Sequence, residues 1–227
     1  MKLAALVAGD VKIQFRYGIY GLYLVFSVLY IGLLFALPES WRERAAVMLI
    51  FTDPSAMGLY FMGAIVLFEK GERALNALAV SPVSPLAYTL SKLVSIAVIS
   101  TSVAAAIGLS SGAVPVTAGF TAGAVLGSCL FSAVGLIVAA RSRTLNGFIL
   151  RTIPYELAIN LPAFGYLFGL KVRWLFAHPG VAIVALYRGD PVSPLVPVVL
   201  VVWTALATML AVRASSRMFR TMGGMKL

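Results

Sequence analysis

The chain has 227 residues, of which 61% are hydrophobic and 11% are charged, and its mean hydropathy is +0.98. A soluble domain is about half apolar and about a quarter charged, and a fold of this size still exposes much of its surface. The composition therefore excludes a water-soluble protein and predicts one whose apolar side chains face a lipid membrane.

The net charge of +10 would suggest nucleic acid as the partner of a soluble protein. In membrane proteins, however, Lys and Arg gather on the cytoplasmic side, where they set orientation and meet anionic lipid. We therefore expect a lipid membrane, and no nucleic acid, as the partner. A single cysteine, Cys129, lies in an apolar run, which excludes a disulfide framework and a thiolate metal cluster.

Residues 1–16 carry apolar side chains at helical spacing between charged ones, which predicts an interfacial helix on the cytoplasmic surface. A cleavable signal peptide is the weaker alternative, because the charged leader is long and the apolar run after it is extended. That run, residues 17–37, is free of charge and ends before Pro38. It is the first predicted membrane span.

Further runs of about the 20 residues needed to cross a ~30 Å bilayer core follow along the chain. They predict spans at 45–68, 88–109, 117–140, 153–170 and 192–212. The apolar part of 171–190 is too short to cross, which predicts an external re-entrant or surface helix. The expected fold is an all-α integral membrane protein with six transmembrane helices in one domain, 1–227.

Two local patterns refine these spans. Thr52-Asp53-Pro54 interrupts the second one, and Asp before Pro favours a helix that begins afresh at Pro54 or kinks there. Gly119, Gly123 and Gly127 form a stripe of small residues on the fourth, which predicts close helix packing.

Orientation follows from the basic residues. Six spans place most of the 18 Lys and Arg residues on the side of the two termini, so both termini are expected to be cytoplasmic.

Few residues favour enzymatic chemistry. The chain has no phosphate-binding G-x-x-x-x-G-K-[ST] loop and no His and Glu pattern with metal-ligand spacing, and its single histidine is His178. We expect no catalytic residue, no metal site and no cofactor bound by this chain.

Two acidic residues stand in apolar sequence, Asp53 and Glu156. Carboxylates inside spans are costly and are usually functional, so both are candidates for a translocation path. The alternatives are structural: Asp53 as a helix N-cap near the outer face, and Glu156 as a partner of Arg151 near the cytoplasmic boundary.

The segment 69–85 between the second and third spans is the most informative one. Charges of both signs lead into the apolar residues Leu75, Leu78 and Ala79, and prolines at 82 and 85 end the run. This pattern predicts a short amphipathic helix in the cytoplasm on which a partner docks. A solvated loop is the alternative.

Together these features resemble the permease subunit of ATP-binding-cassette transporters of the type-2 exporter class. The resemblance rests on the leading interfacial helix, the six spans, the segment Glu69 to Pro82, the pair Ser91-Lys92 and the hairpin before the last span. More narrowly, Thr52-Asp53-Pro54 with Gly58, Leu67-Phe68-Glu69-Lys70 and Ser81-Pro82-Val83-Ser84-Pro85 are similar to fluoroquinolone-export-like permeases.

The resemblance implies that 69–82 is a coupling helix seated on a cytoplasmic ATPase subunit, which binds ATP and Mg²⁺. It also implies a second permease chain, identical or paralogous, in a prokaryotic inner or plasma membrane. The implied docking residues are Glu69, Lys70, Glu72, Arg73, Leu75, Leu78 and Pro82. Gly71 departs from the pattern as a poor helix former, so we expect the second span to end there.

Few charges within the spans favour a lipophilic or amphipathic substrate, such as a drug, a lipid or a peptide. The main rival is an ion-coupled secondary transporter, which predicts paired acidic residues near the middle of the bilayer and an internal repeat. Neither is clear in the sequence. A membrane-embedded lipid enzyme would need a polar cluster at one interface, and the sequence shows none. A non-transporting membrane scaffold or sensor is the remaining alternative.

Overall fold

A computed structural model describes residues 3–72, 74–79, 81–170 and 172–222, without the side chains of residues 53–56, 79 and 222. The described residues form helices joined by short turns, and no strand occurs among them. The helices are α1 (Leu3–Arg16), α2 (Ile19–Ala36), α3 (Glu39–Gly71), α4 (Ala74–Ala79), α5 (Pro85–Ser111), α6 (Ala118–Arg141), α7 (Leu145–Leu167), the 3-10 helix η1 (Arg173–Ala177), α8 (Pro179–Arg188) and α9 (Leu195–Met222).

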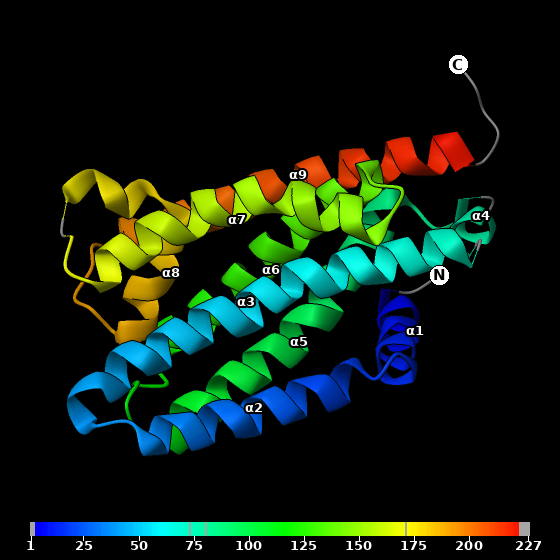
Figure 1. Ribbon diagram of the computed structural model, residues 1–227. Helices are drawn as coiled ribbons and strands as arrows, with labels where there is room; N and C mark the ends of the chain where they lie inside the picture. The colour runs from blue at the N-terminus through cyan, green and yellow to red at the C-terminus, as the bar shows by residue number, and fades with distance from the viewer. Residues whose placement is uncertain (1–2, 73, 80, 171, 223–227) are drawn as a thin grey trace.

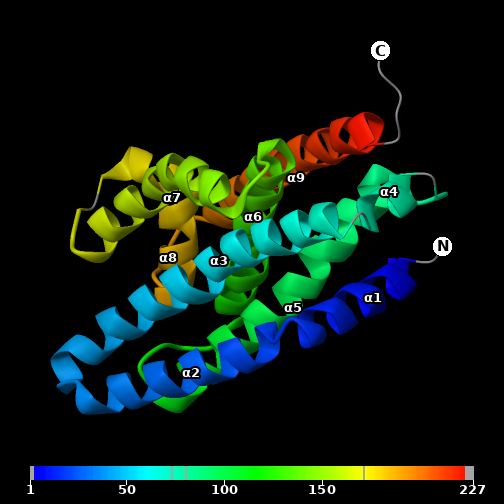
Figure 2. The ribbon, with the colours of Figure 1, turned by 45° about the vertical axis from the view of Figure 1, so that its right-hand side comes forward.

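The long helices α2, α3, α5, α7 and α9 run lengthwise through the molecule, and α6 passes between them at a steeper inclination (Figures 1 and 2). Helix α6 is central and contacts α3, α5, α7, α8 and α9. The short helices mark two ends, with α1, α4 and the end of α9 at one and η1 and α8 at the other (Figure 1). We call these the α4 end and the α8 end.

Five helices in the described part of the chain are long and apolar enough to cross a membrane. They are Ile19–Ala36, Glu39–Gly71, Pro85–Ser111, Ala118–Arg141 and Leu195–Thr221, and they correspond to the predicted first, second, third, fourth and sixth spans. The predicted fifth span, 153–170, falls on α7, which has 23 residues but contains Arg151 and Glu156. Five spans are therefore supported by length and composition, and the sixth is not.

Several helix limits differ from those predicted. Helix α3 continues through Pro54, so no new helix starts there, and it ends at Gly71 as predicted. Helix α7 begins at Leu145, so only 142–144 separate it from α6. Helix α9 continues to Met222, well past the predicted end at 212, because the sequence after the apolar run still favours a helix.

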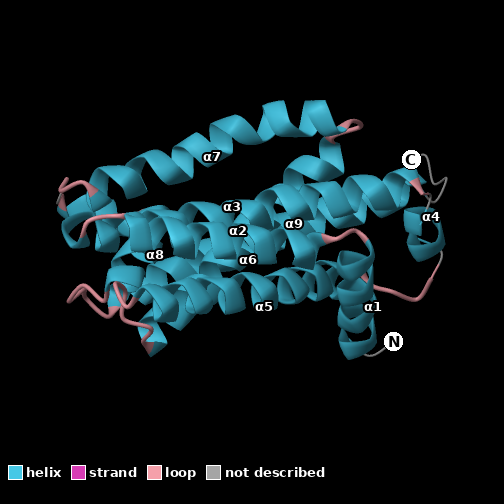
Figure 3. Ribbon diagram, turned by 60° about the horizontal axis from the view of Figure 1, so that its bottom comes forward, coloured by secondary structure: helices cyan, strands magenta, loops and turns pink. Residues whose placement is uncertain are grey.

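The turn between α1 and α2 depends on Gly18, whose φ of 71° lies in the left-handed region that favours glycine. This turn sets α1 at an angle to α2 at the α4 end of the molecule (Figures 1 and 3). One face of α1 packs against α5, and its polar residues Asp10 and Gln14 are buried in that contact.

Helix α8 lies inside the bundle. All of its residues from Pro179 to Tyr187 are buried, and it contacts α3, α6, α7 and α9. Of the two forms predicted for 171–190, a helix lying on the surface therefore does not describe α8.

The glycine stripe of α6 faces α8. A Cβ on Gly123 would lie 3.2 Å from Leu186 Cβ, and one on Gly127 would lie 3.1 Å from Ile183 Cδ1, whereas one on Gly119 would have ordinary contacts at 3.6 Å and beyond. Further along α6, a Cβ on Gly135 would lie only 2.3 Å from the backbone oxygen of Leu59 in α3. Small residues thus bring α6 close to two neighbours.

Candidate functional site

The segment 69–85 folds into a short helix held at both ends. Helix α3 stops at Gly71 and α4 covers Ala74–Ala79. After α4, the Ser81 hydroxyl donates to the Leu78 oxygen. Ser84 then caps α5 by accepting from the Ala87 N–H at 3.1 Å, with Pro85 in the first helical turn.

Helix α4 has the amphipathic character that its sequence predicts. Leu75 is fully buried, and α4 packs against α3 and the end of α9. Asn76 and Ala77 point outward and are exposed, as is Pro82, while Leu78 is half-buried. The solvated-loop alternative is therefore wrong for 74–79.

A buried cluster of charges lies directly beneath this segment. Lys92 Nζ in α5 is 2.9 Å from Asp10 Oδ1 in α1 and 2.5 Å from Glu69 Oε1 in α3. The Tyr88 hydroxyl donates to Glu69 Oε2 at 2.7 Å, and Gln14 Nε2 donates to Ser95 Oγ at 2.8 Å. Buried charges persist only when they are paired, so this cluster holds α1, α3 and α5 in one arrangement.

Lys70 has a different partner. Its Nζ donates to three backbone oxygens at the end of α6, those of Ala139, Ala140 and Ser142, at 2.7, 3.0 and 3.0 Å. A cation at a helix C-terminus satisfies unpaired carbonyls and complements the helix dipole. Lys70 therefore attaches the end of α3 to the end of α6.

Glu72 lies at the surface and connects the end of α3 to the turn after α1. It accepts a hydrogen bond from the Tyr17 hydroxyl at 2.6 Å, which is the main reason that the pKa of Tyr17 is raised above its ordinary value. The rings of Tyr17 and Phe68 stack with centroids 4.9 Å apart. The end of α3 thus contacts the turn after α1, helix α5 and the end of α6.

The implied docking residues consequently divide into two groups. Glu69 and Leu75 are buried, and Lys70 is engaged with α6, so these three face the chain's own helices. Glu72, Leu78 and Pro82 have exposed surface, and Arg73 lies outside the described residues. Sequence reasoning did not identify Asp10, although a lysine at position 92 inside an apolar run requires an acidic partner.

Of the two acidic candidates for a translocation path, the structure describes the side chain of Glu156. Glu156 in α7 accepts a hydrogen bond from the Tyr60 hydroxyl in α3, whereas Arg151 donates to the Arg141 oxygen at 2.7 Å. The alternative that pairs Glu156 with Arg151 is therefore wrong, and Glu156 connects α7 to α3. The side chain of Asp53 lies outside the described residues.

Five apolar helices of membrane-spanning length in the described part of the chain indicate a multi-pass membrane protein. A sequence profile of the Fluoroquinolones export permease protein family matches residues 1–190, and the chain belongs to this family.

Two curated relatives come from Mycobacterium tuberculosis, strains CDC 1551 / Oshkosh and ATCC 25618 / H37Rv, and each is named a fluoroquinolones export permease protein. Each is 29% identical to this chain over 149 residues, which cover 63% of this chain and 61% of the relative. The match thus spans about three fifths of the length of these relatives.

Proposed function

We propose that the chain is the membrane-spanning permease subunit of an ATP-binding-cassette exporter. A separate ATPase subunit binds ATP and Mg²⁺ and docks on the segment 69–85, while this chain has no enzymatic activity of its own. The observation that supports the proposal is that α4 lies at one end of the bundle (Figure 1), with Asn76, Ala77 and Pro82 exposed and with Leu75 buried against the chain's own helices.

These contacts suit the transmission of force. A push on α4 is transmitted to α9 and α3, against which α4 packs. The charge cluster passes the displacement of α3 to α1 and α5, and Lys70 passes it to α6. A displacement at this one segment is therefore transmitted to α1, α3, α5, α6 and α9.

We further propose that α7 also crosses the membrane, as the fifth of six spans, and that both termini are cytoplasmic. Helix α7 runs lengthwise from the turn at 142–144 to the loop after Leu167, as the other long helices do (Figure 2). An even number of crossings returns the end of α9 to the side of α1 (Figure 1). Arg141, Arg213 and Arg217 belong to this side, as the positive-inside rule requires. The membrane is a prokaryotic inner or plasma membrane.

The substrate is proposed from chemistry and from the relatives' names. Those names specify fluoroquinolones, which fits the expectation of a lipophilic or amphipathic drug. The translocation path forms with a second permease chain, in a homodimer or a paralogous heterodimer. Asp53 and Glu156 stay candidates for residues along it.

The test is co-purification of this chain with an ATP-binding-cassette ATPase encoded beside it. The double variant Asn76→Arg/Ala77→Arg places two bulky cations on the exposed face of α4 and is expected to reduce ATPase recovery by about tenfold, since each disrupts a docking contact. Ser110→Arg, at an exposed position on the α8 end, is the control and should leave recovery unchanged.

Transport distinguishes the alternatives. Cells with both subunits should accumulate less fluoroquinolone than cells whose ATPase lacks its P-loop lysine. Export that persists with that inactive ATPase and stops with a protonophore would establish the ion-coupled transporter instead. Unchanged accumulation in every strain, together with normal assembly, would favour the scaffold or sensor.

A further inference from the structure

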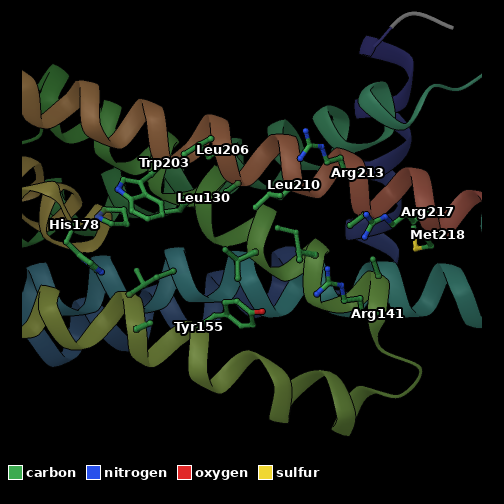
Figure 4. Close-up of a pocket in the computed structure, with 18 of the residues that line it drawn as sticks. Leu130, Arg141, Tyr155, His178, Trp203, Leu206, Leu210, Arg213, Arg217 and Met218 are labelled. Carbon is green, nitrogen blue, oxygen red and sulfur yellow. The ribbon is translucent and has the colours of Figure 1, made fainter.

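A long groove separates α7 from α9, with α6 as its floor (Figure 4). Its volume is about 620 Å³. Leu130 and Val134 of α6 form the apolar floor, and Leu206 and Leu210 of α9 form one wall. At the α8 end the groove is closed by Trp203, whose indole Nε1 donates to the Ala177 oxygen at 3.0 Å.

The other end of the groove is strongly basic. Arg141 of α6 and Arg213 and Arg217 of α9 line it (Figure 4), and all three are exposed. None of them forms an ion pair within the described part of the chain, and no acidic side chain lines the groove. Three guanidinium groups without an ion-pair partner, beside an apolar groove, complement an anion that carries an apolar tail.

The dimensions of the groove fit one leaflet of a bilayer. Helix α9 rises about 15 Å between Trp203 and Arg213, at about 1.5 Å per residue, which is half of a ~30 Å hydrocarbon core. The groove also opens sideways: Leu206 and Leu210 are 50% and 52% exposed, and Tyr155 on the α7 side is 45% exposed. Because α9 crosses the membrane, this opening faces acyl chains.

We infer that the groove binds one anionic phospholipid of the leaflet next to the α4 end. The phosphate lies between Arg141, Arg213 and Arg217, and one acyl chain lies along Leu210 and Leu206 toward Trp203. The lipid fills the space between α7 and α9 that no side chain fills. It is a bound component of the permease, distinct from the exported substrate, and the inference does not depend on the ATPase.

The experiment is native mass spectrometry of the purified full-length chain in detergent, titrated with dioleoyl phosphatidylglycerol or dioleoyl phosphatidylcholine. We expect one phosphatidylglycerol to be retained at concentrations where phosphatidylcholine is lost. Arg213→Gln/Arg217→Gln should weaken its retention by about tenfold or more, since each basic residue near a membrane surface contributes measurably to anionic lipid binding. Leu206→Trp should weaken the retention of phosphatidylglycerol, because the larger side chain fills the groove without any change of charge.

The matched control is Arg16→Gln/Arg220→Gln, which removes two exposed arginines from the same end without touching the groove. Equal losses in both double variants would mean that general surface charge binds the lipid and would overturn the inference. Equal retention of the two lipids would do the same, as would displacement of phosphatidylglycerol by a fluoroquinolone, which would make the groove a substrate site. Size-exclusion profiles identify a misfolded arginine variant, and Leu206→Trp then decides the question.

Discussion

At the scale of single residues, Lys92 joins two buried carboxylates that come from two different helices. It is 2% exposed, and it holds Asp10 and Glu69 at hydrogen-bond distance. Breaking a buried ion pair by removal of one partner leaves an uncompensated charge, which costs more than the pair itself contributes. The cluster is therefore sensitive to the loss of any one member.

Lys92→Met should destabilise the chain by about 3–5 kcal/mol, since two buried carboxylates lose their cation. The measurement is thermal unfolding of the purified protein in detergent. The triple variant Asp10→Asn/Glu69→Gln/Lys92→Met removes every charge of the cluster and should recover much of the loss. If the single and triple variants unfold at the same temperature, charge pairing is not what holds α1 to α3 and α5.

At the scale of elements, glycines determine how closely α6 approaches its neighbours. The distances at these positions differ enough to separate a glycine that is needed for packing from one that is not. Gly135 meets the backbone of α3, which cannot move aside, whereas Gly119 has Thr117 Oγ1 and Leu186 Cδ2 at 3.6 and 3.7 Å, which are ordinary contact distances.

Gly135→Ala should consequently destabilise the chain by about 1–3 kcal/mol through overpacking. Gly119→Ala should be neutral or stabilising by up to about 1 kcal/mol, because alanine favours helices and has room there. Both values come from thermal unfolding in the same detergent. A Gly135→Ala chain as stable as the parent would show that α3 and α6 do not pack as closely as the structure has them.

At the scale of the whole molecule, α7 determines how many times the chain crosses the membrane. Its polar residues reduce its hydropathy, yet it extends between the same two ends as the other long helices (Figure 3). Asn146 near its start and Phe168 just after its end are both exposed, which makes them suitable reporters.

In a Cys129→Ala background, Asn146→Cys and Phe168→Cys should react with a membrane-impermeant maleimide from opposite sides. Intact cells should label Phe168→Cys, and inverted vesicles should label Asn146→Cys, because an α7 that crosses places its ends in different compartments. Labelling of both from one side would limit the protein to five spans and would place the end of α9 outside.

The sequence predicts the elements better than their contacts. Runs of apolar residues located five membrane-spanning helices, and the charges and prolines around 69–85 located α4, because both patterns are local. The partner of Lys70 is a helix end some seventy residues away, and the partner of Glu156 is a tyrosine of α3. Such pairs depend on how helices pack, which periodicity does not specify.

The end of α9 shows the same difference between a local sequence pattern and the folded structure. Hydropathy marks where a chain enters lipid, and it ended the last span at 212. The helix itself continues to Met222, since backbone hydrogen bonding does not stop at the lipid boundary. Arg213 and Arg217 are therefore aligned with the groove by a helical register that hydropathy alone does not show.

The position of Lys92 in the chain has a consequence for biosynthesis. A lysine within a span makes insertion less favourable by up to about 3 kcal/mol when it is alone in lipid. Both carboxylates that neutralise it, at positions 10 and 69, leave the ribosome before it does. The order of synthesis thus supplies the counter-ions first, and a chain that lacks its first helix would insert this lysine with only one of them in place.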